Sequence, residues 1–148
     1  MAIPFNTPTG VPAPAAPSEA RGVLEEASAS RVVVSFAGTS YLMHLEPERA
    51  LNVSPGKRVL GIIKGQARRI DVVRNGGQFV EPVMGRPRIV QGRVAEVNPS
   101  ANGPGTITVQ APMPIVLKVG VLQRAEQFKV GDLVNTHVLP GASFTPLK

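Results

Sequence analysis

Apolar residues in this chain occur in short runs of Val, Ile and Leu, and Gly, Pro, Asn or Asp separates one run from the next. Runs of about four to eight residues that are rich in β-branched side chains are typical of strands rather than helices. The pattern therefore predicts a chain of strands. They cover residues 22–26, 31–36, 40–44, 58–63, 68–73, 89–97, 106–110, 115–119 and 132–139, with an edge strand over 78–83.

A longer pattern occurs twice along the chain with the same internal spacing. Arg49-Ala50, followed by Val53, Gly56 and Val59, recurs as Arg124-Ala125, followed by Phe128, Gly131 and Val134. The same offset places Leu42 on Leu117, whereas Gly22 matches Gly92 at a slightly shorter offset. A longer hairpin loop over 98–105, rich in Asn, Pro and Gly, accounts for the difference. The repeat indicates two copies of one fold.

The predicted fold class is all-β: two tandem small barrel-like halves, of the OB or SH3-like kind, related by the internal repeat and preceded by an extended Pro-rich N-terminal arm. The predicted boundaries are an arm over 1–20, a first barrel-like domain over 21–83, a basic linker over 84–90 and a second barrel-like domain over 91–148. A single sandwich, with 78–88 as the crossover, is the alternative.

The second half has only residues 141–148 left after its fourth strand. We therefore expect it to be one strand short of the first half. An incomplete barrel leaves an open edge, and open edges pair with other chains.

The arm over 1–20 differs from the rest of the chain, with prolines at positions 4, 8, 12, 14 and 17 among Ala, Thr and Gly. Pro fixes φ and lacks a backbone donor, so the segment is predicted to be extended and partly polyproline-like. It has too little apolar surface to fold on itself, and we expect it to lie on a neighbouring chain. Phe5 is the predicted anchor to that partner.

The composition narrows the chemistry of the core and of the partners. The chain has 148 residues, enough for one domain or two very small ones, and with 4% aromatic residues and no Trp its core must be aliphatic. The absence of Cys excludes disulfides, thiolate metal sites and cysteine nucleophiles. We expect no signal peptide, no membrane partner, and a location in the cytoplasm or within a virion or other large assembly.

The net charge of +6 is concentrated in the middle of the chain. Between Lys57 and Arg93 lie nine basic residues against two acidic ones. Such a segment suits a phosphate backbone or an acidic protein surface. The candidate residues for nucleic-acid or acidic-partner binding are Lys57, Arg58, Lys64, Arg68, Arg69, Arg86 and Arg88.

Candidate catalytic groups are few. His44 and His137 both fall on predicted strands among apolar residues, which indicates ordinary strand histidines rather than ligands. A soft-metal site made by Met43 and His44 with Met113 is the alternative. The chain contains no nucleophile elbow, zinc-helix or phosphate-loop motif. We therefore expect no enzyme, no catalytic residues, no cofactor and no metal.

Two functions remain. The first is a non-enzymatic structural or assembly subunit that binds protein, either itself or other subunits, through the arm and exposed strand edges, as accessory subunits of large complexes and viral capsid or tail components do. The alternative is a nucleic-acid-binding module that uses the basic 57–93 segment. Single-strand binding normally adds stacking aromatic residues to such a segment.

Overall fold

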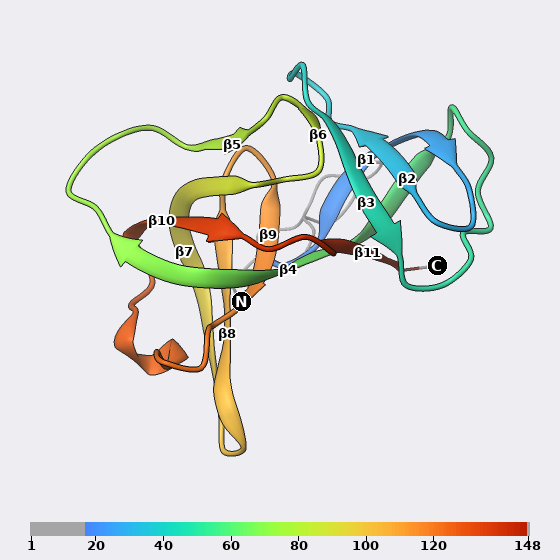
Figure 1. Cartoon of the computed structure of the whole chain (residues 1–148). Helices are drawn as coiled ribbons and strands as arrows, with labels where there is room; N and C mark the ends of the chain where they lie inside the picture. The colour runs from blue at the N-terminus through green and yellow to red at the C-terminus, as the bar shows by residue number, and fades with distance from the viewer. Residues whose placement is uncertain (1–16, 148) are drawn as a thin grey trace, which may run out of the picture.

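The computed structural model describes residues 17–147 (Figure 1), so Phe5 and most of the predicted arm lie outside the described residues. The protein is nearly all-β, as predicted, and a barrel-like class fits its partly ringed sheet. In chain order the elements are β1 (Ala20–Ala27), β2 (Val32–Ser35), β3 (Leu42–Pro47), β4 (Arg58–Val72), β5 (Phe79–Glu81), β6 (Met84–Gly85), β7 (Ile89–Ser100), β8 (Gly103–Gln110), β9 (Pro114–Lys118), the 3-10 turn η1 (Ala125–Gln127), β10 (Leu133–Val138) and β11 (Ser143–Pro146).

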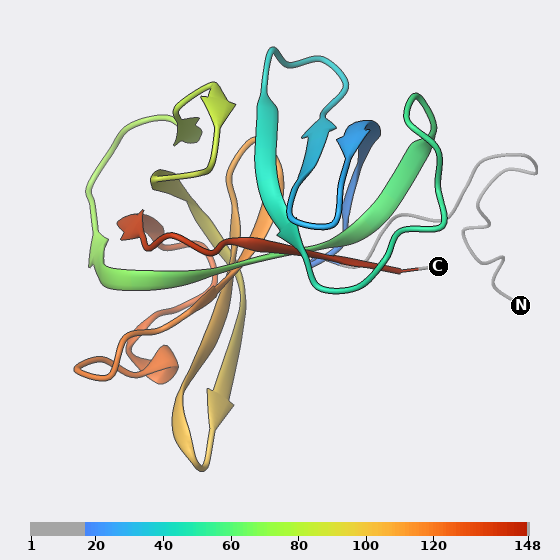
Figure 2. The same ribbon diagram turned by 45° about the vertical axis from the view of Figure 1, so that its right-hand side comes forward.

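The strand pairings form two circuits that share β4. In the first, β1 pairs with β2, β2 with β3, β3 with β11, β11 with β4, and β4 again with β1. In the second, β4 pairs with β10, β10 with β7, β7 with β8, β8 with β9, and β9 again with β4. Figure 2 shows β4 and β11 crossing the middle of the molecule, between its two lobes.

Strand β4 is 15 residues long, where the sequence pattern predicted two strands over 58–63 and 68–73. That part of the prediction is wrong. Buried and half-buried residues alternate without interruption from Val59 to Ala67, so nothing in this stretch forces a turn. The first half of β4 pairs with β1 and β11, and the second half pairs with β9 and β10.

The second half was expected to be one strand short with an open edge, but its circuit closes, and the edge that stays unpaired is limited to the end of β4. The second part of β4 supplies the missing strand, because Lys64, Gly65 and Gln66 pair in parallel with β9. The last strand, β11, crosses instead into the first circuit and lies between β3 and β4. A short local pattern specifies a strand but not the neighbour with which it pairs.

Phe144 on β11 fixes this crossing. Its side chain is fully buried, and it is among the largest of the completely buried side chains. A Cβ atom on Gly61 would collide with the Phe144 ring, so the absence of a side chain on Gly61 makes room for it.

Backbone contacts recur at equivalent places of the sequence repeat. The N–H of Leu24 donates to the carbonyl of Lys57, and the Leu24 carbonyl accepts from Gly56. The equivalent pair of hydrogen bonds in the second copy joins Val94 to Asp132 and Gly131. A bulge follows both Leu24 and Val94 at the same place in the strand.

The third strands of the two sequence copies, β3 and β9, do not match at the offset that relates the second strands. Val34 lies opposite Met43, and its counterpart Val109 lies opposite Ile115. The predicted match of Leu42 with Leu117 is therefore out of register. The turn between β8 and β9 is shorter than the turn between β2 and β3, which sequence matching alone did not detect.

The segment from 79 to 85 joins the two circuits. The predicted edge strand over 78–83 is present as β5, which pairs with β7, and the next strand, β6, pairs with β3. The Val80 N–H donates to the hydroxyl of Tyr41 at 3.1 Å. The residues predicted as a basic linker, 84–90, thus include β6 and the start of β7.

We expect Phe144→Ala to lower the free energy of unfolding by about 3–5 kcal/mol, because it leaves a cavity where β11 meets β4. Urea unfolding followed by far-ultraviolet circular dichroism measures this. Val130→Ala is the control, since Val130 is 68% exposed and should change stability by less than about 0.5 kcal/mol. Equal effects of the two substitutions would contradict the anchoring role of Phe144.

Glu48 holds β11 from the outside. Its carboxylate accepts hydrogen bonds from the hydroxyls of Thr145 (2.7 Å) and Ser143 (3.0 Å), and it lies 3.6 Å from the Lys64 ammonium. The two hydroxyl hydrogen bonds, and then the charge of Lys64, lower the pKa of Glu48 below its ordinary value of 4.5.

Because the folded pKa is lowered, the ionised Glu48 stabilises the fold above the ordinary value, and this contribution is lost as the pH falls through the folded pKa. The side chain is 42% exposed, so we expect a contribution below about 1 kcal/mol. Glu48→Gln should lower the melting temperature slightly at about pH 7, and the difference should shrink at acidic pH, as the pH falls well below the ordinary value of 4.5. Glu46→Gln is the matched control. A Glu48→Gln effect that persists at the acidic pH would contradict this account.

Candidate binding edge on strand β4

Arg68 and Arg69 lie on a bulge in β4. Ile70 lies opposite Thr136 and Ala67 lies opposite Val138, so β4 has one more residue than β10 between these two pairs. An extra residue breaks the alternation of a strand, and both arginines are therefore exposed side by side. The Arg69 guanidinium pairs with the Asp71 carboxylate at 3.0 Å, while its side chain is 80% exposed.

Beyond the bulge, one edge of β4 has no strand partner among the described residues. β9 pairs with β4 only at residues 64–66, and β10 occupies the opposite edge from Ala67 to Val72. The loop that leads from β9 to η1 covers the start of this free edge. Within that loop, the Gln123 side chain accepts from the Ile70 N–H at 2.8 Å and donates to the Ile70 carbonyl at 2.9 Å. Gln123 thus makes the two hydrogen bonds that a neighbouring strand would make.

The next outward-facing backbone groups are those of Val72. In an antiparallel pair, alternate residues point their N–H and C=O toward the partner strand and away from it. The Val73 N–H donates to Leu133 on the β10 side, and Ile70 points to the opposite side, toward Gln123. Val72 therefore points to the same side as Ile70, where no strand of the described chain lies. We call residues 68–72 of β4 the free edge.

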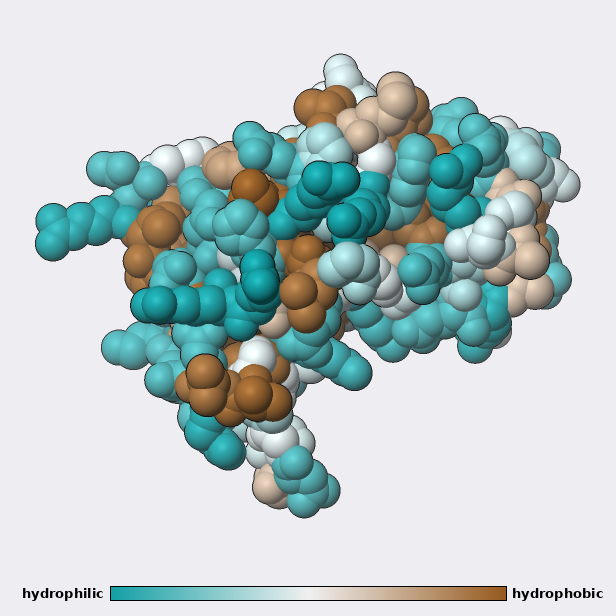
Figure 3. Space-filling model, viewed as in Figure 1, coloured by the Kyte–Doolittle hydropathy of each residue, from teal (hydrophilic) through white to brown (hydrophobic). Residues whose placement is uncertain are grey.

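Exposed apolar side chains lie beside the free edge. Val121 is 88% exposed and Leu122 is 95% exposed, and both line a groove with Arg68, Arg69 and Gln123. Figure 3 shows hydrophobic side chains standing out near the loop between β9 and η1. Isolated exposed apolar residues are ordinary, but two adjacent ones that are almost fully exposed beside a free strand edge make this place a candidate interaction surface.

A second groove continues from the first, because both include Arg68 and Val121. It runs past Lys118 and the part of the β7–β8 hairpin next to its turn, and no acidic residue lines either groove. Asp71, which pairs with Arg69, is the nearby acid. The surface along the free edge is therefore apolar and basic together, a combination that suits an acidic partner with apolar side chains.

Gln123 and Glu48 occupy equivalent places in the sequence repeat. Each follows the third strand of its circuit, and each binds the strand that closes that circuit. Glu48 binds the hydroxyls of β11, whereas Gln123 binds the backbone of β4. In the first circuit Arg49 also donates to the Pro146 carbonyl, so that edge is held by two side chains.

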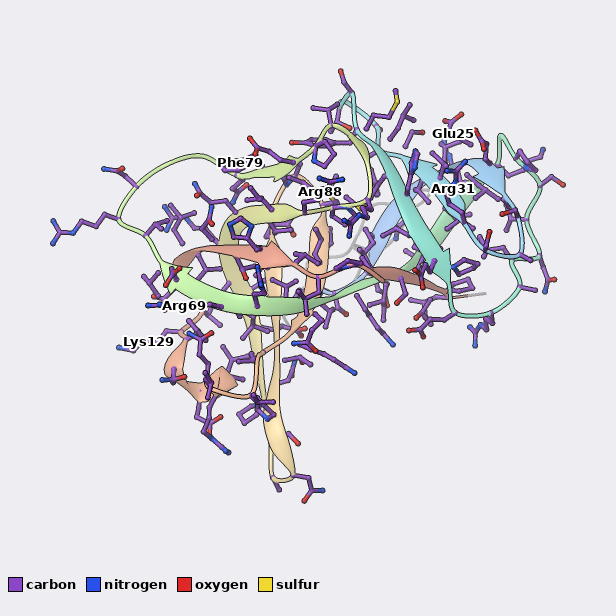
Figure 4. The ribbon with its side chains drawn as sticks, viewed as in Figure 1. Glu25, Arg31, Arg69, Phe79, Arg88 and Lys129 are labelled. Carbon is purple, nitrogen blue, oxygen red and sulfur yellow. The ribbon has the colours of Figure 1, made fainter. Side chains whose placement is uncertain are left out.

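The seven predicted basic residues do not form one surface. Arg58 begins β4 and Lys57 precedes it, about 35 Å along the strand from Arg69. Lys64 pairs with Glu48. Arg86 and Arg88 follow β6, and Arg86 lines a separate groove on the β3 side of the molecule. Arg69 lies at the same end of the molecule as Lys129, and Arg31 lies in the other lobe (Figure 4).

The groups considered for catalysis are dispersed. His44 lies on β3 and His137 on β10, as predicted for strand histidines. Within residues 17–147, no group of three or more His, Asp and Glu side chains is placed to hold a metal ion. The described part of the chain has no helix that could cross a membrane.

Comparison with known proteins gives no match. No family model matches the chain, and neither a curated protein nor a solved structure is significantly similar to it.

Sequence reasoning selected Arg68 and Arg69 but missed Lys118, Val121 and Gln123. Their signal was present in part. The apolar pair Val121-Leu122 lies between the strands predicted over 115–119 and 132–139, outside any predicted strand. Gln123 corresponds to Glu48 in the repeat. Its contact with Ile70 requires β4 to extend into the second circuit, which the sequence did not reveal.

We expect Gln123→Ala to speed hydrogen exchange at the Ile70 amide, because the substitution removes its acceptor. Stability should fall by about 1–2 kcal/mol, the cost of losing two partly buried hydrogen bonds. Amide exchange followed by NMR measures both. Gln78→Ala, at an exposed residue, is the control. An Ile70 amide that exchanges at the wild-type rate in Gln123→Ala would contradict the contact.

Proposed function

We propose that this protein is a non-enzymatic assembly subunit that binds a neighbouring protein chain along the free edge of β4. The observation that carries the proposal is the combination at one place of an unpaired strand edge, two almost fully exposed aliphatic side chains and three basic residues. These are Arg68, Arg69 and Lys118. The N-terminal arm with Phe5, outside the described residues, is proposed as a second contact with the partner.

The described aromatic side chains favour a protein partner over nucleic acid. Phe36, Phe128 and Phe144 are buried, Phe79 on β5 is half-buried, and the Tyr41 hydroxyl accepts from Val80. None of these lines the grooves at the free edge. Stacking platforms for single strands need exposed aromatic faces, and the exposed aliphatic pair in the loop has no counterpart to contact on a phosphate backbone. Nucleic-acid binding by the basic 57–93 segment remains the second candidate, favoured by the grooves that lack acidic residues.

The finer description of the fold belongs to the same proposal. We propose that the two circuits are two copies of one small barrel-like unit of the OB or SH3-like kind, and that each copy gives its last strand to the other. The shared contacts of Leu24 and Val94, and the matching bulges, support this description. The single-sandwich alternative places strands in two separate sheets, whereas the pairings here are continuous.

We expect size-exclusion chromatography with light scattering to show a defined oligomer that persists at high salt. The double substitution Arg68→Glu with Arg69→Glu should shift it toward monomer, because it reverses the charge of the free edge. Lys57→Glu with Arg58→Glu makes the same change of charge at the other end of β4 and should leave the oligomer intact. Refractive index is the suitable detector, since the chain has no Trp and one Tyr.

A monomer at both salt concentrations would contradict self-assembly. Titration with single-stranded DNA would then test the second candidate, which predicts an affinity that falls steeply with salt and is lost in the Arg68→Glu, Arg69→Glu variant. Equal losses in the two charge-reversal variants would show that general charge, rather than the free edge, is responsible.

A further inference from the structure

The Gln123 side chain occupies the place beside Ile70 that a residue of a neighbouring strand would occupy. A side-chain amide has a donor and an acceptor, as a peptide group has, and Gln123 presents both to the N–H and C=O of one β4 residue. Nothing else in the loop from Gly120 to Gln123 is held as a strand by β4. The loop therefore packs Gly120 against the Arg68 carbonyl, hydrogen-bonds the free edge through Gln123, and leaves Val72 beyond it.

We propose that the free edge accepts an extended acidic segment of a partner protein as an added strand, and that this strand displaces Gln123 from Ile70. This inference rests on the proposed function and specifies the partner. Main-chain hydrogen bonds to Ile70 and Val72 would supply the affinity, as in other cases of strand addition.

The side chains around the free edge define the sequence of such a segment. In a strand, alternate side chains point to opposite faces. Ile70 is buried and Val72, two residues on, is 57% exposed, so the partner residues on that face should be aliphatic. Arg69 projects from the opposite face, and Arg68 lies next to it on the bulge. The partner residues on that side should be acidic, since Asp71 offsets only one of these charges.

An uncharged segment would fit less well. Residues 1–16 of this chain contain apolar residues and no acidic ones, so a second copy of the arm would bring no carboxylate to either arginine. The partner is thus argued from charge complementarity, and the arm is one of the outcomes that the test separates.

The test is an NMR titration of the full chain with a short capped peptide in which Glu alternates with Val. We expect protection from exchange to appear at the Val72 amide and shifts at Ile70 and Gln123. Two control peptides isolate the interactions: one has N-methyl groups on alternate residues and cannot form the ladder, and the other has Lys in place of Glu. Both should bind at least about tenfold more weakly.

The direction in which peptide affinity changes in the variant Gln123→Ala separates competition by Gln123 from damage to the fold. If Gln123 competes with the added strand, its removal should tighten peptide binding by about threefold to tenfold, the equivalent of one net hydrogen bond. Damage to the fold would weaken binding instead. Gln78→Ala should leave the affinity unchanged.

The inference would be overturned by equal binding of the N-methylated peptide, by no protection at Val72, or by weaker peptide binding to Gln123→Ala. Displacement of the acidic peptide by a peptide of residues 1–16 at equal concentration would also overturn it. Shifts at Arg68 and Arg69 caused by oligo(dT) but not by the acidic peptide would overturn it in favour of nucleic acid. If the peptide experiments fail but the oligomer still dissociates in the Arg68→Glu, Arg69→Glu variant, the proposed function stands and only the added-strand inference is lost.

Discussion

The whole arrangement depends on one strand being continuous. β4 keeps the alternation of a strand through most of its 15 residues, and β1, β11, β9 and β10 pair with successive parts of it. Gly61 lies against Phe144 in the first lobe, and Gly65 lies close to Val138 and Leu117 in the second. Small residues at these positions let the backbone of β4 approach other strands closely. If β4 turned in its middle, β11 would lose its neighbour and the second circuit would not close.

The same continuity explains why an edge is left free. β9 reaches β4 over only three residue pairs before the chain turns away at Gly120, while β10 follows the other edge to its end. The bulge at Arg68 and Arg69 bends the strand and turns both side chains outward. The free edge thus follows from the geometry of the second circuit, because β9 pairs with a shorter part of β4 than β10 does. Natural proteins protect such edges with charge and with bulges, and this edge has both.

Much of the local structure was predictable from the sequence. The short β-branched runs indicated the strands, and the turn glycines Gly56 and Gly131 indicated the repeat, because both are local signals. The sequence did not predict that β11 pairs within the first circuit or that the end of β4 pairs within the second. A strand pattern does not identify the neighbouring strand. The site was predictable in part for the same reason. Arg68 and Arg69 stood out by charge, but the separation of Lys57 from them follows from the length of β4, and the role of Gln123 follows from a contact between residues far apart in the sequence.

Amide hydrogen exchange along β4 in the unbound, wild-type chain tests the central claim most directly. The claim is that β10 binds one edge of the strand and that the other edge is free beyond Gln123. It predicts slow exchange at Asp71 and Val73, which face β10, and fast exchange at Val72 between them. Uniformly slow exchange over these three residues would contradict it, because the Val72 amide would then have a partner on the edge described here as free.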